Sequence, residues 1–330
     1  MEFIHFSAGK DDEGRRLDKI VRTLLSKENL SGLYKALRSG LIKVNGKKQK
    51  GEYRISSGDD ICIADFLTQK NNSNKKSEEK IQTVSPLPPE WIVFKNQSLL
   101  FVNKPYDLSV QKASADEISL NELVQQDYDF FNSKKTSLSF KTGPLHRLDK
   151  KTTGLIAFSQ DLKGAQWFSE IVREHKIQKN YLALVEGTLK SSQLWTDKIL
   201  KENESQQKTK AFHTVKINSD DKNSKESITQ AAPLAYGTYK GKSVTLVKFN
   251  IKTGRTHQIR SSSAFHGHPL LGDTAYGAQK INEKQTLFLH AWTLILPENS
   301  LGIPKKITCP PGENFVSILE SCLIKLPQEL

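Results

Sequence analysis

The chain has 330 residues, with 49 Lys and Arg against 36 Asp and Glu, so its formal net charge is +13. Its content of 36% hydrophobic and 26% charged residues excludes an intrinsically disordered chain. A membrane-spanning helix is excluded as well, because no apolar run approaches the roughly 20 residues that a bilayer requires. The amino terminus lacks the basic start and apolar stretch of a secretory signal. The surplus charge favours a polyanionic partner but is equally compatible with a merely soluble basic protein.

Two short helices are predicted near the amino terminus. Five apolar residues recur at helical spacing between positions 17 and 25. A second helix is predicted to begin after Ser31, a suitable N-cap, and to stop at Gly40. Its inward face is apolar, so Lys35 and Arg38 are expected to point away from it.

The remaining pattern predicts an α+β protein of two domains. Strands at 41–44 and 61–63 complete a small αβ module over residues 1–66. Residues 67–89 are polar and then proline-containing, which is typical of a flexible linker. Residues 90–330 form the second domain, with a helix at 162–174 and a large, mainly antiparallel sheet. Its strands are predicted at 91–94, 99–105, 155–159, 181–187, 243–251 and 287–296. The polar stretch 201–230 is interpreted as a surface excursion.

Three cysteines, Cys62, Cys309 and Cys322, are widely separated and form no CxxC pair. This spacing predicts neither a disulfide framework nor a zinc ribbon. It favours a reducing compartment, and we expect the protein in the cytoplasm.

Residues 143–154, GPLHRLDKKTTG, place Asp149 among cations in a loop just before a buried strand. Such surroundings suit a reactive carboxylate, although a solvated ion pair is the commoner explanation of such a pattern. Residues 252–260, KTGRTHQIR, supply donors for phosphates or base edges, among them Arg255 and Arg260. The alternative is that they are ordinary surface residues.

A metal-dependent hydrolase is a further hypothesis, with His257, His266, His268 and Asp273 as ligands. It is disfavoured because the sequence has no HExxH helix and no cysteine near these residues. Phosphate-binding GxxxxGK[ST] and GxGxxG motifs and the GxSxG nucleophile motif are also absent from the sequence. Nucleotide-driven chemistry and the common hydrolase mechanism are therefore disfavoured.

Several of these segments resemble the conserved blocks of the RluA-type pseudouridine synthases, and they occur in the order found in that family. They run through almost all of residues 90–297. The blocks are FVNKP (101–105), HRLDKKTTGLIAF (146–158), KNYLALVEG (179–187), KTGRTHQIR (252–260), GHPLLGDTAYG (267–277) and LFLHAWTL (287–294). Two departures stand out: Lys151 and Thr153 replace the Asp and Ser that are common at these positions.

The resemblance implies roles for individual residues. Asp149 matches the essential aspartate, Tyr181 the tyrosine that stacks on the target base, and Arg255 the arginine that pairs with the aspartate. Arg147 matches the residue thought to fill the gap left by the flipped base, and Leu289 an apolar residue of the pocket. His146 and Arg260, which lie in the same blocks, are predicted to bind substrate.

The amino-terminal segments RLDKIVRTLL (16–25), LYKALRSGLIKVNGKK (33–48) and GDDICI (58–63) are similar to an S4 RNA-binding module. Its RNA-facing residues are predicted to be Lys35, Arg38, Lys43, Lys47 and Lys48, although they could be ordinary solvated side chains. S4 modules often precede the catalytic domain in relatives that modify large-subunit rRNA. The resemblance therefore implies rRNA as the substrate, with tRNA remaining open.

The implied reaction breaks the N1–C1′ bond of a uridine, rotates the uracil and joins C5 to C1′. One carboxylate is sufficient as nucleophile or base, so we expect neither a metal nor an organic or nucleotide cofactor. The sequence does not distinguish attack at C1′, addition to the ring or a glycal route. We expect a monomer without a membrane partner. The alternative function is a non-catalytic RNA-binding protein that assists ribosome assembly.

Overall fold

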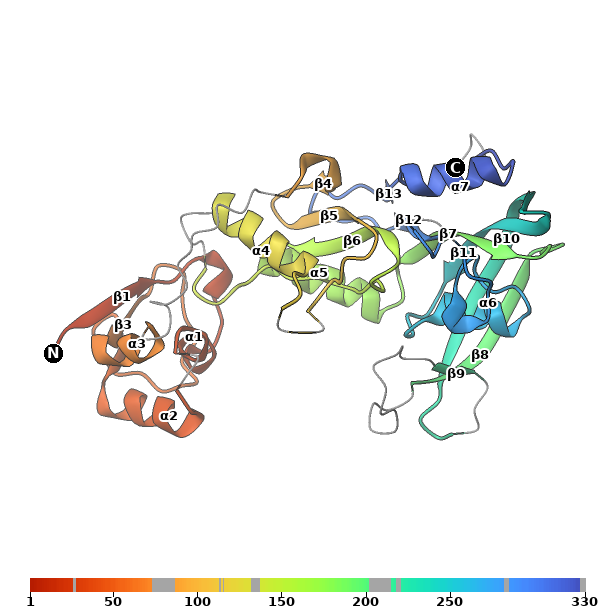
Figure 1. Cartoon of the computed structure of the whole chain (residues 1–330). Helices are drawn as coiled ribbons and strands as arrows, with labels where there is room; N and C mark the ends of the chain where they lie inside the picture. Colours follow the sequence, from red (N-terminus) through yellow and green to blue (C-terminus); the bar gives the residue numbers. More distant parts are fainter. Residues whose placement is uncertain are drawn as a thin grey trace. The chain divides into compact units, whose positions relative to one another are not determined.

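The computed structural model describes residues 1–25, 28–72, 87–112, 114, 116–131, 137–201, 215–217, 221–281 and 285–326 (Figure 1). They form two compact units. The first comprises Met1–Pro88, Glu122–Gly143 and Ser159–Ala165, and the second comprises Pro89–Asn121, Pro144–Phe158 and Gln166–Leu330. The predicted division followed chain order and assigned 90–330 to a single domain. The structure differs, because two later segments pack with the amino-terminal module.

The first unit contains a three-stranded antiparallel sheet of order β1-β3-β2. Its strands are β1 (Phe3–Ser7), β2 (Ile42–Val44) and β3 (Asp60–Ala64). The helices are α1 (Leu17–Leu24), α2 (Leu30–Ser39) and α3 (Asp65–Asn72), and a 3-10 turn spans Lys10–Asp12. Apolar side chains of α1, α2 and β3 form its core.

Helix α2 begins earlier than predicted. Asn29 is the N-cap, because its Oδ1 accepts a hydrogen bond of 2.7 Å from the Gly32 amide, and Ser31 lies inside the helix. The predicted stop at Gly40 is confirmed, since this residue has a φ of 80°. Helix α3 occupies the start of the predicted linker, and residues 73–86 of that linker lie outside the described residues.

The second unit contains a ten-stranded sheet. Its order is β4 (Ile92–Lys95), β5 (Leu99–Lys104), β6 (Thr153–Ser159), β12 (Leu289–Ile295), β7 (Gln178–Glu186), β11 (Lys242–Ile251), β10 (Lys225–Tyr239), β8 (Gln193–Lys201) and β9 (Val215–Ile217), with β13 (Lys306–Thr308) paired to β12. The β6–β12 pair is parallel, and the pairs from β12 through to β9 are antiparallel. The predicted α+β class with a mainly antiparallel sheet is confirmed.

Strands β9 and the first part of β10 lie in the stretch 201–230, which was interpreted as a surface excursion. That interpretation is wrong for 215–217 and 225–230, because both segments pair with β8. Their polar composition gave no strand pattern, because an antiparallel strand with one face in water needs few apolar residues. Residues 202–214 and 218–220 lie outside the described residues.

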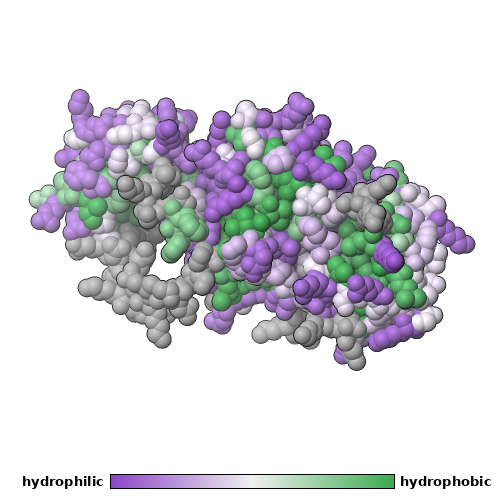
Figure 2. Space-filling model, turned by 90° about the horizontal axis from the view of Figure 1, so that it is seen from above, coloured by the Kyte–Doolittle hydropathy of each residue, from purple (hydrophilic) through white to green (hydrophobic). Residues whose placement is uncertain are grey.

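Helices cover parts of the large sheet. They are α5 (Leu162–Arg173), α6 (Gln258–Phe265) and α7 (Glu313–Ser321), and α4 (Leu120–Phe131) runs from the second unit into the first. Two further 3-10 turns span Pro89–Trp91 and Thr274–Tyr276. None of the helices in the described ranges is long and apolar enough to cross a bilayer. Hydrophilic side chains cover much of the face seen in Figure 2, and hydrophobic areas lie between them.

Alternation along β7 divides its side chains between the two faces of the sheet. Leu182 and Leu184 pack in a core cluster with Phe315 of α7. Tyr181 therefore points to the opposite face, where α6 lies. At the start of β6, Gly154 has a φ of 101°, and a Cβ there would collide with the backbone of Ala291. Glycine thus allows β6 to lie against β12 and fixes the loop that precedes it.

Candidate active site

A cavity of about 490 Å³ opens in the second unit between the loop before β6, strand β7, the first turn of α6 and the start of β12. Its lining includes every residue of the predicted catalytic pocket. These are Asp149, Tyr181, Arg255, Arg147, Leu289, His146 and Arg260. Sequence blocks that are up to 143 positions apart thus meet in one cavity, and the sheet order brings them together.

Asp149 lies in the loop before β6, with its side chain 30% exposed. Its carbonyl accepts a hydrogen bond of 3.0 Å from the Thr152 amide, which closes a turn. The carboxylate thus stands on a short loop that is fixed to a buried strand. This is the kind of position in which a rigid scaffold presents a reactive side chain.

Lys104 stabilises this loop through hydrogen bonds to backbone carbonyls. It is 0% exposed, and its ammonium donates hydrogen bonds of 2.8 Å to the carbonyls of Pro105, Leu108 and Lys150, the residue after Asp149. Burial lowers the pKa of Lys104 to about 7, while the negative charge of Asp149 favours the ammonium. An ammonium has three donors, which match the three carbonyls. The sequence showed this lysine only as part of the FVNKP block.

Arg260 is the arginine beside the candidate catalytic aspartate. Its Nη1 lies 3.8 Å from Oδ2 of Asp149. Its Nε and Nη2 donate hydrogen bonds of 2.7 Å to the two carboxylate oxygens of Asp273, and both residues are buried. This bidentate pair fixes the guanidinium plane, so that the remaining edge faces Asp149.

In this structure Arg255 does not pair with Asp149, and its predicted catalytic role stays a prediction. Its Nε donates a hydrogen bond of 2.9 Å to the carbonyl of Glu226, and its side chain is exposed. Arg255 precedes α6 on an outer turn, whereas Arg260 lies inside the helix on the face that is buried against the cavity. Both arginines lie in one block, and only the start of the helix determines which of them faces inward.

Gln258 shapes the turn between the two arginines. Its Oε1 accepts hydrogen bonds from the Thr253 hydroxyl and the Arg255 amide, at 2.9 and 3.0 Å. Its Nε2 donates to the Ile228 carbonyl at 3.1 Å. A buried amide that uses both of its ends defines the path of the loop, and this explains why α6 starts where it does.

His257 and Tyr276 complete the surroundings of the carboxylate. His257 Nε2 lies 3.8 Å from Oδ2 of Asp149, and its Nδ1 lies 2.8 Å from the Tyr276 hydroxyl. The Tyr276 ring lies 5.1 Å from the guanidinium carbon of Arg260. Burial raises the pKa of Tyr276 to about 12, so it remains a neutral phenol. Sequence reasoning placed neither residue beside Asp149, because their contact depends on how the 267–277 segment folds back on α6.

Tyr181 and Leu289 form the apolar side of the cavity. They are 8% and 4% exposed. Burial, and then the charge of Asp149, raises the pKa of Tyr181, so its ring stays uncharged. Lys179, two residues earlier on β7, also lines the cavity, and burial lowers its pKa. The sequence showed Lys179 only as part of a block.

His146 lines the cavity, yet its Nε2 accepts a hydrogen bond of 3.0 Å from the Ala157 amide of β6. Its ring stacks on Phe168, with centroids 5.9 Å apart. Burial, with a smaller contribution from the charge of Lys179, lowers the pKa of His146 to about 3. The Nε2 atom of this predicted substrate-binding residue therefore stabilises the fold through its bond to β6. Arg147 is exposed at the cavity.

Stability of the second unit is predicted to fall as the pH drops from 6.5 towards 4. Burial lowers the pKa of His146 to about 3 and that of His290 to about 4. The unfolded chain therefore binds two protons in this range that the folded unit does not. Each histidine contributes a slope of up to about 1.4 kcal/mol per pH unit.

All four tryptophans lie in this unit, so urea unfolding followed by tryptophan fluorescence measures the slope. His146→Gln should remove about half of it, and an unchanged slope would contradict the prediction.

The four proposed metal ligands are engaged separately. Asp273 holds Arg260, and His257 contacts Tyr276. His266 stacks on Trp195 with centroids 4.7 Å apart. His268 Nδ1 lies 3.3 Å from the carbonyl of Glu186. The metal-dependent hydrolase therefore receives no support from the described geometry.

Comparison with known proteins finds two matching family models. A family model described as RNA pseudouridylate synthase matches residues 98–265, more than half of the chain. The chain belongs to the RNA pseudouridylate synthase family. It is therefore an isomerase whose substrate is RNA. An S4 domain model matches residues 15–61, which confirms the predicted amino-terminal module.

Similar proteins cover nearly the whole chain. The "Ribosomal large subunit pseudouridine synthase C" of Vibrio vulnificus is 27% identical over 94% of this chain and 94% of its own length. The protein of the same name from Escherichia coli K12 is 28% identical over 96% of this chain and 94% of its own. The structure of human RNA pseudouridylate synthase domain containing 4 aligns with a TM-score of 0.56 and 22% identity, over 72% of this chain and 94% of that one. The last likeness concerns the fold alone.

Proposed function

We propose that this pseudouridine synthase isomerises uridine in large-subunit rRNA, with Asp149 as its catalytic carboxylate. The observation that carries the proposal is the position of Asp149. The carboxylate lies in the cavity 3.8 Å from Arg260, and the same cavity is lined by the ring of Tyr181. The proposed rRNA substrate is supported by the S4 match and by the names of relatives that align over almost their full length.

The chemistry requires an ionised aspartate and a site that retains free uracil. Arg260 and His257 both approach Oδ2 of Asp149, so we propose Oδ1 as the oxygen that attacks the substrate or removes its proton. The guanidinium, held by Asp273, stabilises negative charge at the carboxylate without having to reorganise. The reaction is neither a net redox change nor a hydrolysis. For this reason we propose that the enzyme acts without a metal or an organic cofactor.

The uridine must leave its stack to reach Asp149. Flipping costs a few kcal/mol, and stacking on an aromatic ring offsets part of that cost. We propose Tyr181 as this ring, Leu289 as the apolar wall beside the detached uracil, and Arg147 as the residue that enters the vacated gap. The exposed position of Arg147 at the cavity supports this role. The Nζ of Lys151 lies 3.4 Å from the Thr286 hydroxyl.

The substrate is tested with RNA from cells that lack the gene. Purified full-length protein is incubated with large-subunit rRNA and, separately, with tRNA from these cells, and pseudouridines are mapped in each. New pseudouridine at defined rRNA positions is the expected result. Modification of tRNA alone would refute the rRNA proposal. No modification of either RNA, with tight RNA binding retained, would favour the non-catalytic assembly protein.

We propose that the S4 module contacts RNA phosphates through basic residues of α2, β2 and the β2–β3 connection. Lys35, Arg38, Lys47 and Lys48 are exposed and Lys43 is half-buried. Such contacts position RNA without reading its sequence. We further propose that the enzyme acts as a monomer in the cytoplasm.

Removing three of these charges should weaken RNA binding and its salt dependence. For Lys35→Gln, Arg38→Gln and Lys47→Gln combined, the slope of log K against log salt should fall by about 0.7–0.9 for each lost phosphate contact. Filter binding at several salt concentrations measures it. The control removes three exposed lysines of the second unit, Lys222, Lys225 and Lys242. Equal losses in both triple variants would show that only the net charge matters.

A further inference from the structure

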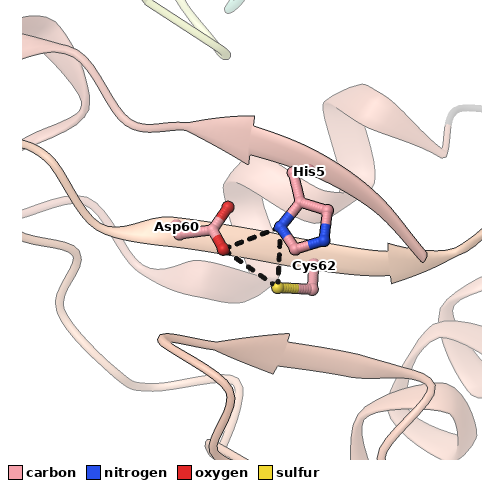
Figure 3. Close-up of side chains that lie close together, drawn as sticks. All are labelled: His5, Asp60 and Cys62. Atoms are coloured by element: carbon pink, nitrogen blue, oxygen red, sulfur yellow. Dashed lines mark hydrogen bonds and ion pairs between the residues drawn. The ribbon is translucent and has the colours of Figure 1, made fainter.

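Three metal-ligand side chains meet on the sheet of the first unit, far along the chain from the catalytic blocks. His5 of β1 lies directly opposite Cys62 of β3 in the antiparallel register. Asp60 precedes Cys62 by two residues, so both point to the same face of the sheet. Figure 3 shows the three side chains turned towards one another. The neighbouring Ile61 and Ile63 point to the other face and are fully buried in the core.

The donor atoms are already close together. His5 Nδ1 lies 2.8 Å from Oδ2 of Asp60 and 3.5 Å from Sγ of Cys62, and Cys62 Sγ lies 3.2 Å from the same Oδ2. Within the described ranges this is the one group of three such side chains whose ligand atoms all lie within 4.8 Å of one another.

We propose that His5, Asp60 and Cys62 bind a divalent cation of the zinc class. An imidazole nitrogen, a thiolate and a carboxylate oxygen are the ligands that zinc takes, at about 2.0–2.3 Å and in tetrahedral geometry. Those bond lengths place two ligand atoms about 3.3–3.6 Å apart. The His5–Cys62 separation fits this range, the Cys62–Asp60 separation is close to it, and the His5–Asp60 pair must open by about half an ångström.

Exposure permits this adjustment and leaves room for a fourth ligand. The side chains of His5 and Asp60 are 65% and 41% exposed, so both can move, and water can complete the tetrahedron. Cys62 is only 6% exposed and provides the fixed ligand. The site therefore has three protein ligands and one open position.

The charges of the site also suit a divalent cation. A thiolate and a carboxylate together neutralise a charge of +2. Zinc is bound by the thiolate form of cysteine, so metal binding releases the proton of Cys62. Lys43 of β2 lies opposite Cys62, and its ammonium lies 4.8 Å from the centroid of the Phe3 ring. A neutral metal site is compatible with this nearby cation.

Bound metal would join two strands that the chain supplies from distant positions. β1 is an edge strand and β3 is the central strand of this sheet. A ligand that binds only the folded state stabilises it by mass action. The site would therefore hold the amino-terminal edge strand in the S4 module. This is independent of pseudouridine formation.

Cobalt titration of the full-length reduced protein tests the site. One equivalent of Co²⁺ should give a thiolate-to-cobalt charge-transfer band, and Zn²⁺ should bleach it. Cys62→Ala should lose the band. His5→Gln and Asp60→Asn should each weaken binding by at least about tenfold, because loss of even an outer-shell partner costs about 10–100-fold. The control is Ser7→Ala, opposite Asp60 on the same face, which should bind as the parent does.

Two results would overturn the proposal. One is cobalt binding without a thiolate band. The other is a band that survives Cys62→Ala, which would assign it to Cys309 or Cys322. Circular dichroism of each variant establishes that it is folded. If Cys62→Ala fails to fold, His5→Gln, whose side chain is exposed, decides the question through its affinity alone.

Discussion

Asp149→Asn should abolish pseudouridine formation, lowering the rate by at least about 10⁴-fold, as the loss of an essential catalytic group does in other enzymes. The amide has nearly the same shape as the carboxylate but can act neither as nucleophile nor as base. Single-turnover assays that count pseudouridine in the rRNA substrate measure the loss. RNA binding should be retained, because the S4 module and the cavity rim remain unchanged.

A matched control separates chemistry from charge. Asp107→Asn removes another carboxylate whose charge acts on Lys104, from an exposed position with a φ of 59° that asparagine tolerates. Its rate should stay within a few fold of the parent. Substantial turnover by Asp149→Asn would refute the assignment of this residue. Equal loss in both variants would point to a change in the loop that Lys104 secures.

Arg260→Lys should lower the rate by about 10²–10³-fold, whereas Arg255→Lys should lower it by less than about tenfold. A lysine cannot reproduce the bidentate contact with Asp273 and still present a third edge to Asp149. Arg255 contacts only a backbone carbonyl through its side chain in the described structure, and it is exposed. Rates of both variants under single-turnover conditions, at saturating enzyme, measure the difference.

A variant of Asp273 tests the same contacts between Arg260, Asp273 and Asp149 in a second way. If Asp273 acts by orienting Arg260, Asp273→Asn should lower the rate, and the double variant with Arg260→Lys should lose less than the two effects combined. Additive effects would indicate that Asp273 has a separate role. A larger loss in Arg255→Lys than in Arg260→Lys would contradict the assignment made from the geometry.

Much of the fold could be predicted from patterns along the chain. The strands at 99–105, 155–159, 181–187 and 243–251 are rich in β-branched and aromatic residues, and each is present in the large sheet. Local signals of this kind depend only on neighbouring residues. Polar strands give a weak signal, so β8, β9 and β10 were not predicted.

The sequence by itself determined which blocks form the proposed site: Asp149 in its loop, Tyr181 on a buried strand and a cluster of donors before α6. The tertiary structure alone decided which donor faces the carboxylate. Arg255 and Arg260 are five residues apart in one block, and because α6 starts at Gln258, Arg255 lies before the helix and Arg260 lies within it. It also brought His5 beside Cys62, because strand pairing joins residues 57 positions apart that no local pattern connects.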